Sequence, residues 1–129
     1  MADFGSTPNL VAGGTIAPFR LVKLSATADF TGLQADAATK LVVGVTDGSV
    51  RRFDASAHAL EGDTISLQPT DTVQVTSSAA ITRGALLTSD ANGKAITATT
   101  GQPAFYIALE SAGAADLIIR AYRIGAVTA

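Results

Sequence analysis

Apolar and polar side chains alternate with a period of two along two segments near the end of the chain, which is the pattern of a β-strand. Ala104–Glu110 and Asp116–Arg123 show this alternation, and a run of small residues around Gly113 joins them. We therefore predict a β-hairpin in which Gly113 is a turn residue. Phe105, Ile107 and Leu109 share one face of the first strand, and in the second strand Leu117, Ile119 and Ala121 alternate with Ile118, Arg120 and Tyr122.

A second hairpin is predicted immediately before the first. Ala85–Ser89 and Lys94–Thr99 flank the sequence Asp90-Ala91-Asn92-Gly93. Asn and Gly tolerate a positive φ better than other residues, so Asn92 and Gly93 are typical of a tight reversal between two strands.

The first half of the chain has weaker strand signals. Thr15–Ser25 is predicted as a strand with Pro18 near its start, and Leu41–Thr46 as a strand in which Gly44 indicates a bulge or a close backbone approach. In the second of these, Leu41, Val43 and Val45 are expected on one face. Between the two, Ala26–Lys40 favours one helical turn or a broad loop.

The middle of the chain has short apolar alternations separated by turn residues. Asp54 could cap a short helix within Ser49–Leu60, or this segment is an irregular loop. Ile65 and Leu67 alternate with polar residues after the Glu61-Gly62-Asp63 turn, and Val73 and Val75 do so after Pro69–Asp71. Short strands at such spacing indicate an all-β, mainly antiparallel fold, either a small barrel or a sandwich, with at most one short helix.

One domain is expected over residues 15–129, preceded by an extended arm over residues 1–14. The arm mixes turn residues with isolated apolar ones and is either a frayed terminus or a segment that orders against a neighbouring subunit. Arg51 and Arg52 form the one basic pair and lie either on a solvated turn or at an interface with an acidic partner. The candidate partner-binding residues are Phe4, Leu10, Val11, Ile16, Phe19, Arg51 and Arg52.

Composition limits the possible partners. The chain of 129 residues has a net charge of −2 and no run of Lys or Arg, so the basic stripe that nucleic-acid binding requires is missing. Neither a signal peptide nor an apolar run of about 20 residues is present, so we expect no membrane partner and synthesis in a cytoplasm. Cysteine is absent, which excludes disulfides and thiolate metal sites.

No constellation typical of catalysis or of cofactor binding is found. His58 is the single histidine, and with Glu61 it supplies two ligands at most, whereas a metal site normally needs three. The Asp90–Gly93 segment resembles part of a calcium loop, but Lys94 follows where further acidic ligands are needed. We therefore expect neither an enzyme nor a metal or cofactor site.

The C-terminal part of the chain resembles the capsid decoration (cement) proteins of tailed bacteriophages. The likeness covers roughly the last two-thirds of the chain and rests on hairpin motifs. Leu41–Thr46 and the turn into Ile65 are similar to the central part of that family. The matching residues are Gly84, Leu87, Asp90, Gly93, Ala95, Ile107, Ala108, Leu109, Glu110, Asp116, Leu117 and Ile118.

The resemblance implies a structural virion protein that binds the outer surface of an icosahedral head in many copies and reinforces capsomer junctions. Its partners would be the major capsid protein and further copies of itself, as a homotrimer or homodimer. Assembly would take place in the host cytoplasm. Two alternatives stay open: another virion component, such as a head fibre or a tail or spike adaptor, and a small ligand-binding β-barrel.

Overall fold

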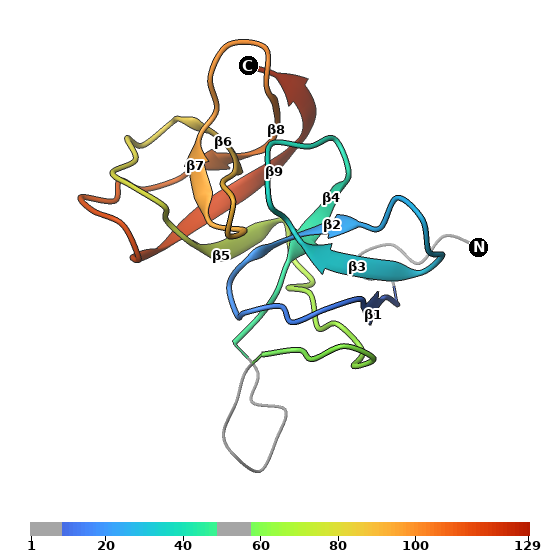
Figure 1. Cartoon of the computed structure of the whole chain (residues 1–129). Helices are drawn as coiled ribbons and strands as arrows, with labels where there is room; N and C mark the ends of the chain where they lie inside the picture. Colours follow the sequence, from blue (N-terminus) through green and yellow to red (C-terminus); the bar gives the residue numbers. More distant parts are fainter. Residues whose placement is uncertain (1–8, 49–57) are drawn as a thin grey trace.

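The computed structural model describes residues 9–48 and 58–129, which form nine strands in two sheets and no helix (Figure 1). No helix in this part of the chain could therefore cross a membrane. Every strand pair is antiparallel except β1 with β3. The predicted all-β, mainly antiparallel fold is confirmed, as a sandwich-like pair of sheets without a closed barrel.

The four-stranded sheet has the order β1-β3-β2-β4, and the five-stranded sheet has the order β5-β9-β8-β6-β7. The strands are β1 (Val11–Ala12), β2 (Leu21–Leu24), β3 (Thr31–Gln34), β4 (Val42–Val45), β5 (Thr72–Thr76), β6 (Leu86–Ser89), β7 (Ala95–Thr97), β8 (Pro103–Ala108) and β9 (Ile118–Thr128).

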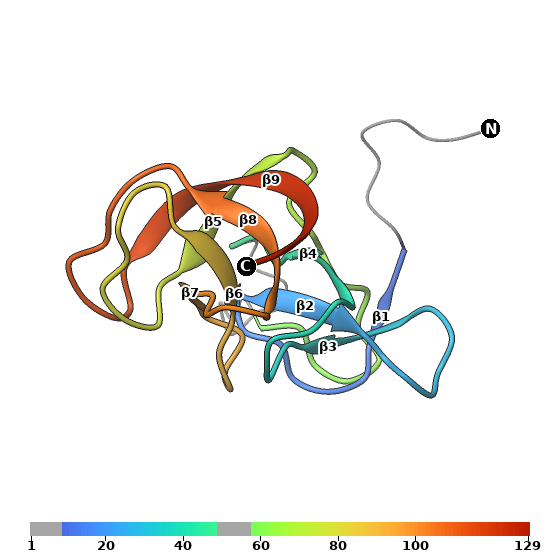
Figure 2. The same cartoon turned by 90° about the horizontal axis from the view of Figure 1, so that it is seen from above.

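The four-stranded sheet buries apolar side chains on both of its faces. On one face, residues such as Leu21 and Val45 pack with the inner face of the five-stranded sheet. On the other face, Val22 packs with side chains of residues 59–67, which cover this side of the sheet. Figure 2 shows the two sheets from above. The second cluster consists of Leu10, Ala12, Ile16, Val22, Ala59, Ile65 and Leu67.

Both predicted hairpins are present. In the β8–β9 hairpin, Ala104, Tyr106 and Ala108 are buried on β8, and Ile119 and Ala121 are buried on β9, so the predicted alternation is confirmed. Strand β9 extends to Thr128, beyond the predicted end, and the pairing shifts between Ala104 and Tyr106. The connecting loop contains Gly113 in the ordinary range of φ, and the positive φ of this connection belongs to Asp116 at 64°.

The β6–β7 turn touches the other sheet. Gly93 has a φ of +73°, while Asn92 is not among the residues with positive φ. The Asp90 carboxylate accepts the backbone N–H groups of Asn92 and Lys94 at 2.8 and 2.9 Å, which fixes the turn. The Gly93 carbonyl in turn accepts the N–H of Leu21 at 2.8 Å. This turn is therefore a joint between the two sheets.

Three predictions for the first half need correction. β3 lies in Ala26–Lys40, where we expected a helical turn or a loop. β2 begins only at Leu21 because Phe19 has a φ of 55°, which breaks an extended strand. In β4, Gly44 pairs with Val22 and Val42 pairs with Lys23, so Val43 has no partner on β2 and forms a β-bulge. The bulge reverses the alternation, so Val42 and Val45 share the core between the sheets while Val43 packs on the other cluster.

The outer edge of β5 is capped by side chains and backbone. The Gln68 amide accepts the N–H of Gln74 at 2.8 Å and donates to its carbonyl at 2.6 Å, as a neighbouring strand would. The N–H of Thr76 donates to the carbonyl of Phe19 at 3.0 Å. An uncapped edge strand is a template for pairing with other chains, so these contacts block strand addition at β5.

Ser77 fixes the loop before β9. Its hydroxyl is fully buried, donates to the carbonyl of Ala114 at 2.9 Å and accepts the N–H of Leu117 at 3.1 Å. Two backbone hydrogen bonds, one with Leu117 and one with Asp116, join the same segments.

Replacing Ser77 with alanine is expected to lower the free energy of unfolding by about 1–3 kcal/mol, because the carbonyl of Ala114 and the N–H of Leu117 lose the buried hydroxyl that bonds to both. Chemical denaturation of Ser77→Ala measures this loss, with Thr82→Ala, which removes an exposed hydroxyl, as the control. Equal midpoints for the two variants would contradict the role given to Ser77.

Candidate functional site: an interaction surface

The described residues offer no cluster of side chains that could hold a metal ion. Within residues 9–48 and 58–129, no group of three or more His, Asp and Glu side chains gathers in one place. His58 is exposed at the start of the second described range. Exposed apolar side chains and charged groups define the surfaces of the described residues that could bind a partner.

The predicted partner-binding residues lie in different environments. Phe4, Arg51 and Arg52 are outside the described residues. Phe19 is half-buried, and its ring lies against Gly48, where a Cβ atom would be only 2.6 Å from the ring. Asn92 is exposed in the β6–β7 turn, and Gly93 is buried there.

Residues 9–14 of the predicted arm belong to the folded body. Leu10 and Ile16 are 3% and 0% exposed in the second apolar cluster, so they form core and present no surface to a partner. Backbone hydrogen bonds hold this segment on both sides: the N–H of Val11 donates to Phe30 and that of Ala12 donates to Asp63, each at 2.8 Å. Val11 itself is 43% exposed.

Phe30 is an exposed aromatic residue at the tip of the β2–β3 hairpin, and the sequence pattern did not predict it as a functional residue. Phe30 is 76% exposed and has a φ of 52°. A bulky side chain rarely adopts this left-handed conformation, and a large exposed ring gains nothing from folding. The one sequence signal is its place in TADFTG, an isolated aromatic among turn-forming residues.

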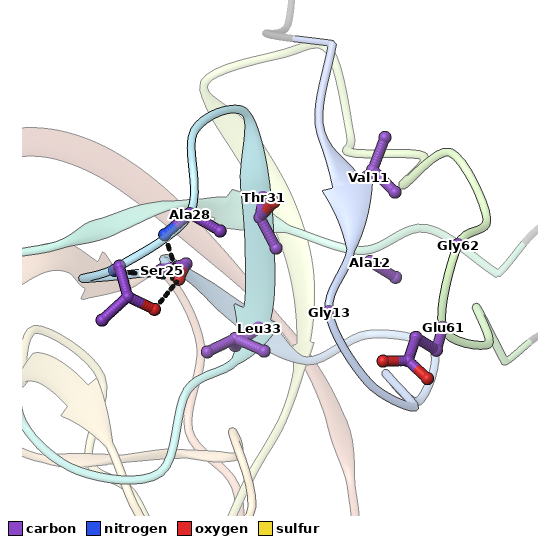
Figure 3. A pocket seen from close by; sticks show the side chains of 10 residues that line it. Val11, Ala12, Gly13, Ser25, Ala28, Thr31, Leu33, Glu61 and Gly62 are labelled. Carbon is purple, nitrogen blue, oxygen red and sulfur yellow. Dashed lines mark hydrogen bonds between the residues drawn. The ribbon is translucent and has the colours of Figure 1, made fainter.

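Beside this tip, an open hollow of about 500 Å³ lies along β1 and β3. Figure 3 shows Ala28, Thr31 and Leu33 on one side of β1, and Glu61 and Gly62 on the other. Glu61 is the one charged residue among those that line it, the others being Val11, Ala12, Gly13, Ser25, Thr27, Ala28, Thr31, Leu33 and Gly62.

A second apolar surface covers the outer face of the five-stranded sheet. Ile107 is paired with Tyr122 on one side and with Leu86 on the other, so the three form a row across β9, β8 and β6. Tyr122 is 44% exposed, and Leu109 and Ile118 nearby are 46% and 51% exposed. This face is apolar around Ile107, and Arg120 in the same row of β9 pairs with Glu110. A hollow of about 290 Å³ lies at the ends of β8 and β9, lined by Lys40, Pro103, Phe105, Ala126, Val127 and Thr128.

Three ion pairs lie on the surface of the described residues. The Lys23 ammonium donates to Asp36 at 2.8 Å, and hydrogen bonding to it lowers the pKa of that carboxyl. Arg120 lowers the pKa of Glu110, and Lys94 that of Asp116, in the same way. All three carboxylates are well exposed, so each pair contributes little to stability.

Burial raises the pKa of the Tyr106 hydroxyl above its ordinary value of 10.0, and Arg123, 6.0 Å from the ring centre, opposes the rise. When folding raises the pKa of a group, the group contributes stability at a pH below its pKa in the unfolded chain. This contribution is lost as the pH rises through the pKa of the group in the folded protein. We expect the melting temperature to fall above pH 10 less steeply in Tyr106→Phe than in the unmodified protein. Parallel pH profiles would contradict the burial of this hydroxyl, and Tyr122→Phe is the exposed control.

Comparisons with known proteins identify a fold. Neither a protein-family model nor any curated protein matches this sequence. A solved structure does match: the crystal structure of the head fiber gp8.5 N base in bacteriophage phi29. The two are 18% identical with a TM-score of 0.66, over 94% of this chain and 96% of that chain. The likeness therefore extends over most of the chain and shows a shared fold.

Proposed function

We propose that this chain is a structural protein of a tailed-phage virion that binds the outer surface of the icosahedral head in many copies, as a capsid decoration protein. The observation that carries the proposal is the fold that it shares, over 94% of its length, with the base of a phage head fibre. The hairpin motifs that resemble decoration proteins point the same way. Its partners are the major capsid protein and further copies of itself, in a homotrimer or homodimer, and it has no catalytic role.

The surface properties of the described residues suit this task. Binding to a shell needs apolar surface that folding leaves uncovered, and such surface is present at Phe30 and around Tyr122. A protein concentrated on a crowded shell also needs protection against edge-to-edge aggregation, which the capped edge of β5 supplies. A protein that binds only the mature shell stabilises it by mass action, and contacts to several subunits add avidity.

The base of a head fibre is the second candidate, favoured by the identity of the structural neighbour. In that role the same body would attach to the head and carry a projecting element. In both roles the protein would attach to the head through the same surface. Only the base of a head fibre would also carry a projecting element.

Titration of purified heads that lack the protein tests the proposal. The protein should co-sediment with the heads and saturate at a fixed ratio to the major capsid protein. A ratio of many copies per head supports either head-surface role, whereas saturation at a few copies indicates a tail or vertex component. Absence of co-sedimentation would refute the proposal.

A further inference from the structure

The tip of the β2–β3 hairpin combines strain with exposure. Phe30 has a φ of 52° and is 76% exposed, although glycine or asparagine would fit this turn more easily. The strained backbone is held in place: the carbonyl of Phe30 accepts the N–H of Val11 at 2.8 Å, and the Thr31 hydroxyl donates to the carbonyl of Asp29 at 3.0 Å. Conformational strain maintained by surrounding contacts is typical of functional positions.

The hollow beside the tip can receive side chains but cannot receive an added strand at β1. The backbone N–H groups of Val11, Ala12 and Gly13 already donate to carbonyls, at 2.8, 2.8 and 2.9 Å. The Ser25 hydroxyl likewise accepts two backbone N–H groups, from Thr27 and Ala28 (Figure 3). What remains for a partner is the apolar lining.

The charge at this end is negative. Glu61 is the one charged residue that lines the hollow, and Asp29 is exposed next to Phe30 at the tip. The nearest lysine in sequence, Lys23 on β2, donates to Asp36 at 2.8 Å. A partner that places a cationic group beside apolar side chains therefore complements this surface in charge and in polarity.

We propose that Phe30 and the adjacent hollow form the docking site for a segment of the head shell protein that carries a Lys or Arg beside apolar side chains. Phe30 packs against the apolar part of this segment, and Glu61 binds its cationic group. The inference rests on the proposed function, and it assigns shell binding to this end of the four-stranded sheet in preference to the outer face of the five-stranded sheet.

The Phe30→Gly variant separates binding from folding. Glycine accepts the positive φ without strain, so the variant should melt at the same temperature as the unmodified protein or higher. Its affinity for purified heads that lack the protein should nevertheless fall at least tenfold. Leu109→Ala is the matched control, because it removes a 46% exposed apolar side chain from the other sheet and should leave the affinity unchanged.

The Glu61→Gln variant tests the charge. Its affinity for heads should fall several-fold at low salt and approach that of the unmodified protein at high salt, because screening removes the lost attraction from both. Glu110→Gln is the control, since Glu110 belongs to an ion pair with Arg120 at 2.9 Å outside the proposed site.

Each outcome decides the inference. If the unmodified protein binds heads and both Phe30→Gly and Glu61→Gln bind equally well, the docking site is refuted while the proposed function stands. If Leu109→Ala lowers the affinity and Phe30→Gly does not, the shell binds the outer face of the five-stranded sheet. If Phe30→Gly keeps its affinity but changes the oligomeric state in ultracentrifugation, the site binds a second copy. If the unmodified protein does not bind heads, the function and the site fall together.

Discussion

Replacing Gly93 with valine is expected to lower the free energy of unfolding by about 2–4 kcal/mol. Two causes add. Valine resists the positive φ of +73° at this position. A Cβ atom there would also lie 2.7 Å from Cγ of Gln34 and 3.3 Å from the carbonyl oxygen of Ala35, so the turn could not keep its contact with the four-stranded sheet.

Two other glycines separate these causes. Gly84 has a φ of +88°, but a Cβ atom added there would have no neighbouring atom within 4 Å. Gly84→Val should therefore lower the free energy of unfolding by about 1–2 kcal/mol, from backbone strain alone. Gly113 has neither a positive φ nor a neighbour within 4 Å, and Gly113→Val should change stability by less than about 0.5 kcal/mol. Urea unfolding of the three variants should give the order Gly93, Gly84, Gly113 in decreasing loss. If Gly93→Val and Gly84→Val lose the same free energy of unfolding, the contact between the β6–β7 turn and the four-stranded sheet contributes nothing to stability.

Replacing Ile16 with alanine is expected to cost about 2–5 kcal/mol, as is usual for a fully buried aliphatic side chain. Ile16 packs in the second apolar cluster, and its backbone exchanges hydrogen bonds with Ala59 at 2.8 and 2.9 Å. The sequence had suggested Ile16 as a partner contact, and the two roles differ in this measurement. Val11→Ala, at a 43% exposed position on β1, should cost less than about 1 kcal/mol.

If Ile16→Ala lowers the free energy of unfolding only slightly and also weakens binding to heads, then Ile16 contacts the partner, as the sequence had suggested. Removing residues 2–14 is expected to destabilise the fold for the same reason, because β1 and Leu10 are lost with them.

The sequence was most informative where paired strands follow one another directly in the chain. The alternation in Ala104–Glu110 and Asp116–Arg123 depends only on neighbouring residues, and it correctly separated Tyr106 and Ile119 from the exposed side chains opposite them. The same was true of the turn at Gly93. Local pairing leaves a local pattern, so these elements could be predicted.

Strand β3 could not be predicted because its inward position is a glycine. A Cβ atom at Gly32 would lie 2.6 Å from Cδ1 of Ile65 and 3.0 Å from Cγ1 of Val22, so this strand has little room for an apolar side chain on that face. The alternation that marks a strand is therefore missing from Thr31–Gln34. Gly44 did indicate the bulge in β4, but the sequence did not show which residue is extra, since Val43 is as apolar as its neighbours.

The remaining errors come from contacts between distant segments. Leu10 is buried because its backbone carbonyl accepts the N–H of Ile65 and its side chain packs in the cluster that Ile65 joins. Nothing near Leu10 in the sequence indicates this partner. Phe30 was missed because a positive φ and a bare ring are properties of the folded tip, whereas the composition of its turn is ordinary.

Electron cryomicroscopy of heads with and without the protein tests the central claim most directly, which is that this β-protein is a structural part of the phage head surface. The difference map should show density at many equivalent positions on the outside of the shell, with the four-stranded sheet fitting closest to the capsid protein. Density confined to the tail, or no difference between the two sets of heads, would contradict the account.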